Sequence, residues 1–241
     1  MRNFLLFPLA ALVALAPAAT AQSGSFIVSQ HGQKVGTASF HLTPTPHGSD
    51  LTSVVRIAMK GLDYDLSTTE RLTPDNRMRQ VQLSGAVNRS AVTVTATPDA
   101  TQIVLNISAN GHTTTTPLAA HPAAVFLADF DPGALQTLLS LAVVQNGHDL
   151  WAIIPKKDGS IEPIQLATYA DQNGALDGRP IVVHHLVATI SGAATDLFSG
   201  PENQLLQAEL PQVGFALVRK GFVLTPPSKP GAPPAAQPAA K

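Results

Sequence analysis

Residues 131–147 read DPGALQTLLSLAVVQNG and predict the one helix of a chain that is otherwise built from strands. Asp131 is a favourable N-cap and Pro132 suits the first helical turn. Residues 134–145 are expected to be helical, and Asn146-Gly147 to end the helix. Apolar side chains leave it almost no polar face: Leu135, Leu138, Leu139, Leu141, Ala142, Val143 and Val144. Such a helix has to be buried nearly all round, so we expect it in the concavity of a curved sheet.

On both sides of this segment, apolar and polar residues alternate with the period of two that is typical of strands. The alternation is clear in 64–72, where Tyr64, Leu66 and Leu72 share one face. The predicted strands are 35–42, 51–59, 64–72, 78–87, 91–97, 102–107, 150–154, 163–169, 180–190, 204–210 and 215–224. Short turns such as Asn110-Gly111 favour antiparallel hairpins. The predicted fold is therefore mainly β: a single highly curved antiparallel sheet, or half-barrel, with one buried helix.

Three segments depart from this simple pattern. Residues 180–190 are apolar on both faces and predict a central strand that is buried on both sides. Residues 118–130, apolar and rich in Ala, are expected to close over the concavity as a loop or a short helix. Residues 113–116 are four consecutive Thr, which suit an exposed edge strand or a linker surface.

The composition excludes several classes of function. The 241 residues contain no Cys, which excludes disulfides, Cys-based metal sites and a thiol nucleophile. A net charge of −1 offers no basic field, so nucleic acid is not expected as a partner. Aromatic residues make up only 5%, which argues against carbohydrate sites and other sites that depend on stacking rings.

The two ends are expected to lie outside the fold. Residues 1–21 are typical of a secretory signal: Arg2, an apolar run, and Ala19-Thr20-Ala21 as a cleavage site. The alternative is an uncleaved anchor, but the run is short for a membrane span. Residues 22–224 form one predicted β-rich domain, and the Pro/Ala-rich residues 225–241 a disordered tail. We expect a secreted or periplasmic protein without an integral membrane segment after cleavage.

The order of these features resembles a broad group of secreted or periplasmic bacterial β-proteins of uncharacterised function. The matching pieces are 26–36, 62–74, 78–85, 194–198, 203–211 and 217–219. In the last hairpin, Phe198 stands where a Trp is expected. The fold that this resemblance implies is similar to that of the periplasmic lipoprotein carriers, in which a half-barrel holds acyl chains against helices. The resemblance implies no catalytic residues.

Sites for metal or acid–base chemistry are weakly indicated. His184 and His185 are neighbours on a predicted strand, so their side chains point to opposite faces and cannot bind one ion together. No metal site and no cofactor are predicted. Glu70 falls on the inward register of its strand, where an ionised carboxylate needs a partner, either Arg56 or Arg79. A structural ion pair explains Glu70 without catalysis.

The sequence favours binding of an apolar ligand, such as a lipid or acyl chain, in the concavity and without chemistry. Aliphatic walls suit an acyl chain, because each buried methylene contributes about 0.8 kcal/mol without any polar motif. The residues expected to line the site are Val125, Phe126, Phe130, Leu135, Leu138 and Leu139, and the alternative is that these side chains simply fill the core. Two alternatives remain: a cell-envelope scaffold or partner-binding module with a filled core, and a hydrolase with an unrecognised carboxylate or His site.

Overall fold

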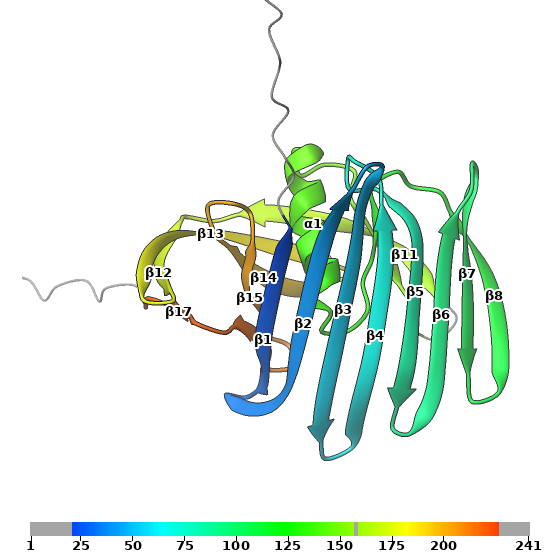
Figure 1. The fold of residues 1–241 in the computed structure, drawn as a ribbon, viewed down its shortest axis with the longest axis horizontal. Helices are drawn as coiled ribbons and strands as arrows, with labels where there is room; N and C mark the ends of the chain where they lie inside the picture. Colours follow the sequence, from blue (N-terminus) through cyan, green and yellow to red (C-terminus); the bar gives the residue numbers. More distant parts are fainter. Residues whose placement is uncertain (1–20, 157–158, 227–241) are drawn as a thin grey trace, which may run out of the picture.

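The computed structural model describes residues 21–156 and 159–226, which form one large open sheet and one helix (Figure 1). Residues 1–20 of the expected signal and residues 227–241 of the expected tail lie outside the described residues. The elements are β1 Gln22–Gln30, β2 Gln33–Thr45, β3 Gly48–Met59, β4 Leu62–Leu72, β5 Met78–Val87, β6 Ser90–Pro98, β7 Gln102–Ala109, β8 His112–Ala119, β9 Ala124–Phe126, α1 Pro132–Val144, β10 Trp151–Ile154, β11 Ser160–Thr168, β12 Gln172–Leu176, β13 Arg179–Ile190, β14 Ala193–Ser199, β15 Leu205–Leu210, β16 Phe215–Arg219 and β17 Phe222–Leu224.

Successive hairpins generate most of the sheet. Strands β1 to β8 each pair antiparallel with the next, and β1 also pairs with β16. From β16 the pairing continues through β15 and β14 to β13, which pairs with both β11 and β12. In Figure 1, β1 to β8 stand side by side as a wall, and β12 and β17 belong to a smaller lobe at the left. The prediction of a mainly antiparallel, open, curved sheet is confirmed.

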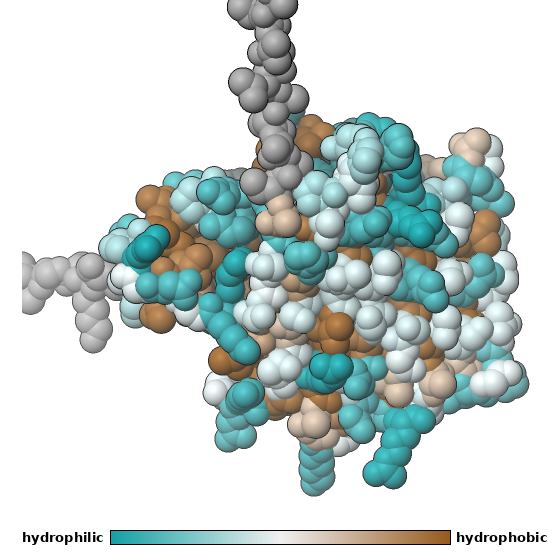
Figure 2. Space-filling model, in the orientation of Figure 1, coloured by the Kyte–Doolittle hydropathy of each residue, from teal (hydrophilic) through white to brown (hydrophobic). Residues whose placement is uncertain are grey.

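The wall is buried on one face only, as the alternation predicts. In β4, Tyr64, Leu66 and Leu72 are buried, while Asp65 and Arg71 are exposed. The outer face of the wall is mainly hydrophilic or weakly polar (Figure 2). The buried side chains of β1 to β7 therefore form the inner face of the sheet, against which the remaining elements pack.

The segment 118–130 forms neither a plain loop nor a helix. It contains β9, which pairs with β10 in parallel and is the exception to the antiparallel expectation. Parallel neighbours need a long crossover connection, and α1 supplies it between β9 and β10. The Thr run belongs to β8, so the strand alternative is correct for 113–116.

Two strand predictions need correction. β13 is central but is not buried on both faces, because Val182 is 47% exposed. Among the described residues of the small lobe, no second layer covers this side of the strand. Residues 215–224 form two strands, not one, with a turn at Lys220-Gly221, where Gly221 has φ +82°. The break lets the chain leave β15, the partner of β16, and pair with β12 through β17.

The helix begins as the sequence predicts. The Asp131 side chain accepts hydrogen bonds from the backbone N–H groups of Gly133 and Ala134. α1 packs against β2, β3, β9 and β15, and most of its residues are buried. Burial is not complete, because Val143 and Val144 in the last turn are 64% and 47% exposed. The last turn is thus only partly covered.

Gln136 anchors the buried helix to the sheet through two hydrogen bonds. Its Oε1 accepts from the backbone N–H of Leu205 at 2.7 Å, and its Nε2 donates to the backbone oxygen of Asn203 at 2.9 Å. The side chain is 1% exposed, so water cannot replace these bonds. Gln136 therefore satisfies backbone groups at the start of β15 that the covering helix would otherwise leave unpaired.

We expect Gln136→Leu to lower the free energy of unfolding by about 1–3 kcal/mol, because it leaves a buried N–H without a partner. Urea denaturation followed by circular dichroism measures this change. Ser140→Ala is the matched control on the same helix, since the Ser140 hydroxyl only donates to the Gln136 carbonyl at 3.0 Å. Equal effects of the two substitutions would contradict the anchoring role.

Candidate functional site

An apolar hollow of about 220 Å³ lies on the inner face of the sheet and is called the inner pocket here. Strands β4, β5 and β6 form its floor, and the segment 127–129 together with Pro155 and Lys156 forms its rim. The lining consists of Tyr64, Leu66, Leu83, Val87, Val92, Val94, Leu127, Ala128, Asp129, Pro155 and Lys156. Apolar side chains therefore dominate a hollow whose charged groups, Asp129 and Lys156, belong to the rim.

These two rim charges are paired with each other. Lys156 Nζ lies 2.9 Å from Asp129 Oδ1, and the two side chains are 63% and 39% exposed. Exposed ion pairs contribute only about 0–1 kcal/mol to stability. The link across the rim can therefore open at little energetic cost.

Aromatic contacts hold the segment that carries Asp129. The Tyr64 hydroxyl donates to the backbone oxygen of Asp129 at 3.2 Å, and burial above all raises the pKa of that phenol, so it stays protonated as a donor. The Phe130 ring meets Tyr64 edge-on at 6.2 Å and lies 4.5 Å from the ring of Phe215. Phe130 has φ +59°, a strained conformation for a bulky residue that costs about 1–3 kcal/mol.

None of the six residues expected to line the site is among those that line the inner pocket. Val125 and Phe126 of β9 and Leu138 and Leu139 of α1 are each 1% exposed, in the continuous core. Phe130 and Leu135 are half-buried. Leu139 also lines a separate opening of about 270 Å³ beside the end of α1. Sequence reasoning did not identify Tyr64 and Leu66 as pocket residues. Their inward register shows that they are buried, but no local sequence pattern shows that the segment 127–129 covers them.

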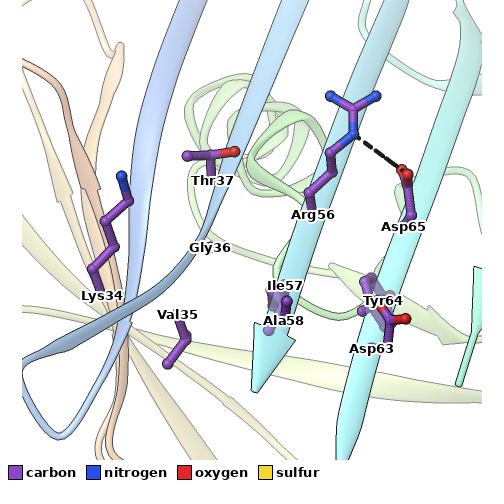
Figure 3. Close-up of a pocket in the computed structure, with 10 residues that line it drawn as sticks. All are labelled: Lys34, Val35, Gly36, Thr37, Arg56, Ile57, Ala58, Asp63, Tyr64 and Asp65. Carbon is purple, nitrogen blue, oxygen red and sulfur yellow. Dashed lines mark hydrogen bonds and ion pairs between the residues drawn. The ribbon is translucent and has the colours of Figure 1, made fainter.

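Glu70 is buried as expected, but neither predicted arginine is its partner. Arg56 pairs with Asp65 on the outer face, with Nε 3.3 Å from Oδ1 (Figure 3), and Arg79 is exposed. Glu70 instead faces α1, where the Thr137 hydroxyl donates to Glu70 Oε2 at 3.5 Å. The reason is the inward register, which points Glu70 away from the outer-face arginines.

Three polar atoms meet α1 without a protein partner. They are Glu70 Oε1, Asp131 Oδ2 and Ser53 Oγ, all buried. A Cβ on Gly133 would lie 3.2 Å from the Ser53 Cβ, which shows how closely the start of α1 approaches β3. Burial first, and then the Asp131 charge, raise the pKa of Glu70 to about 8. Glu70 therefore holds its proton at neutral pH, next to the N-cap of α1.

The histidine pair separates as strand geometry requires. His184 Nδ1 lies 2.9 Å from Asp171, whereas His185 Nε2 lies 2.8 Å from Asp196. Within 21–156 and 159–226, no three His, Asp or Glu side chains are grouped so that they could hold a metal ion.

Comparison with known protein families, with curated proteins and with solved structures found no match. The resemblance to secreted bacterial β-proteins thus stays a prediction. In the part of the chain that the structure describes, no helix has both the length and the apolar character needed to cross a bilayer.

The raised pKa of Glu70 predicts a pH-dependent stability. Its folded value of about 8 exceeds the ordinary 4.5, so the stabilising effect of the bound proton is complete below 4.5 and is lost as the pH rises through 8. Glu70→Gln keeps the shape without the ionisation. We expect its stability relative to the wild type to increase steadily across that interval in urea titrations.

The control is Glu202→Gln, because Glu202 is exposed. It removes one carboxylate from the surface without touching the buried face of β4. A stability difference from the wild type that stays constant with pH for Glu70→Gln would show that Glu70 is ionised in the folded protein.

Proposed function

We propose that this is a secreted or periplasmic protein that binds an apolar ligand, such as a single acyl chain, in the inner pocket. The observation that carries the proposal is the aliphatic lining of a hollow on the inner face, beneath a segment with a weak ion pair. Its volume of about 220 Å³ exceeds the ~150 Å³ of an apolar cavity that admits benzene. Each methylene transferred from water into it contributes about 0.8 kcal/mol.

The volume also limits the ligand. Sites for drug-sized molecules usually enclose about 300–1,000 Å³, more than the inner pocket offers. The proposal is therefore one extended alkyl chain and not a bulky lipid with several chains. The polar headgroup would stay at the rim, beside Lys156 and Asp129.

Entry requires the segment 127–130 to move. The Lys156–Asp129 ion pair and the Tyr64 hydrogen bond that hold it can both be remade with water or ligand. The ring contacts of Phe130 and the hydrogen bond from the Leu127 N–H to the Ile153 oxygen, at 2.9 Å, also have to break. Release of Phe130 from φ +59° would offset part of the energy of opening. Of the residues expected from the sequence, Phe130 then moves with the segment, and Val125 and Phe126 directly precede it in β9. Leu135, Leu138 and Leu139 belong to α1 and do not line the inner pocket.

The second candidate is a cell-envelope scaffold or partner-binding module with a filled interior. The observation that favours it is the continuous core, in which four of those six residues are 1% exposed. Neither candidate involves chemistry or a cofactor. They differ in whether the inner pocket takes up an alkyl chain.

We test this with decanol as the probe, followed by calorimetry and by native mass spectrometry. Val92→Trp places an indole in the inner pocket and should weaken decanol binding by about tenfold or more. Thr93→Trp is the matched control, because Thr93 is the next residue on the same strand and its exposed side chain faces outward, away from the pocket. It should bind as the wild type does.

Circular dichroism of both variants checks that the β-sheet is intact. Lipid that co-purifies with the native protein should also be absent from Val92→Trp. If the wild type takes up no decanol, or both variants bind it equally, the scaffold function stands instead.

A further inference from the structure

A second cleft opens at the point along β13 where its partner strand changes from β12 to β11. In the strand order of the sheet, this point is several strands away from the inner pocket. On one edge of β13, β12 pairs with Arg179–Val183 and β11 pairs with Leu186–Ile190. His184 and His185 lie between these two pairings. The link from β11 to β12 crosses here, and the Tyr169 backbone N–H donates to the His185 oxygen at 2.9 Å. The departure of the chain from the ladder creates the cleft.

The His185 ring is held in one orientation. It stacks on Phe198 with centroids 4.5 Å apart and an angle of 11°, and it faces Tyr169 at 5.0 Å and 29°. Its Nε2 lies 2.8 Å from Asp196 Oδ1. With Nε2 donating to the Asp196 carboxylate, the tautomer that carries its hydrogen on Nε2 leaves Nδ1 as an acceptor. At present Nδ1 meets only the Gln172 amide, at a long 3.4 Å.

The cleft has a volume of about 550 Å³, within the usual range of small-molecule sites of about 300–1,000 Å³. Tyr169 presents an aromatic face at its mouth and is 54% exposed. Gln172 and Asn173 bring amide groups to the same cleft, and among residues 21–156 and 159–226 no Lys or Arg lines it. Its carboxylate, Asp171, is already paired with His184 at 2.9 Å.

We propose that this cleft binds a neutral, polyhydroxylated ring, that is, a saccharide. Asp171 and Asp196 each already have a histidine partner, so both carboxylates are engaged within the protein. The exposed face of Tyr169 offers the flat apolar surface on which a sugar ring stacks through its C–H groups. His185 Nδ1 and the Gln172 amide offer an acceptor and a polar side chain for ring hydroxyls.

The low aromatic content of the chain does not argue against this site. Composition measures the total, whereas a stacking site needs one placed ring. The chain has only two Tyr, and one of them, Tyr169, lies beside His185 and within the cleft. A low total of aromatic residues is therefore compatible with one saccharide site at Tyr169.

The test uses the full chain with three neutral disaccharides, cellobiose, maltose and chitobiose, in saturation-transfer difference NMR. We expect at least one to bind and to shift the ¹⁵N resonance of His185 Nδ1. Tyr169→Ala should weaken that binding by roughly tenfold, whereas Tyr169→Phe, which keeps the ring, should stay close to the wild type. Val223→Ala, at an exposed apolar position of the same lobe, is the control and should have no effect.

A further variant, His185→Phe, keeps the stack with Phe198 but removes the Nδ1 acceptor, and should also lose binding. Because it leaves Asp196 unpaired and can destabilise the lobe, the Tyr169 variants decide the outcome if it does not fold. Absence of transfer from all three sugars, or binding that Tyr169→Ala leaves unchanged, overturns the proposal.

Discussion

The inner face of the sheet has to be covered by an element that satisfies its own backbone polar groups, and α1 meets this constraint. A loop in that place would leave buried N–H and C=O groups unpaired. A helix pairs the backbone N–H and C=O groups of its interior with each other and leaves unpaired only those at its two ends. Asp131 satisfies two N–H groups at the start, and Gln136 serves the backbone of the strand that α1 covers. The parallel pair β9–β10 follows from the same helix, which is their crossover.

Covering a one-sided sheet in this way places polar groups where water is excluded. The inward register of β4 includes Glu70 as well as Tyr64 and Leu66, and the start of α1 brings Asp131 to it. A bound proton resolves the conflict, because a neutral carboxyl is far less costly to bury than a second negative charge. The same strand then continues into the apolar floor of the inner pocket. Polar and apolar parts of the inner face are thus separated along β4.

The two proposed sites arise from two different irregularities of one sheet. The inner pocket lies where a curved face is incompletely filled, so its walls are mainly aliphatic. The His185 cleft lies where an edge of β13 changes partner, so it exposes amides, a stacked imidazole and one aromatic face. The small lobe also exposes apolar residues, seen at the left of Figure 2. A regular antiparallel sheet would have neither site.

Local periodicity predicted most of the longer strands, their inward faces and the helix with its Asp131 cap, because alternation and capping depend on residues a few positions apart. It did not predict β1, β12 or β14. The buried position of Glu70 and the core positions of Leu138 and Leu139 follow from the same patterns. The tertiary structure alone decided the partner of Glu70, the short parallel β9, the break at Lys220-Gly221 and both clefts. Each brings together residues distant in the chain, as Tyr64 meets Asp129 and Glu70 meets Thr137, 67 positions away. No local pattern encodes such contacts, since they depend on how the whole sheet curves.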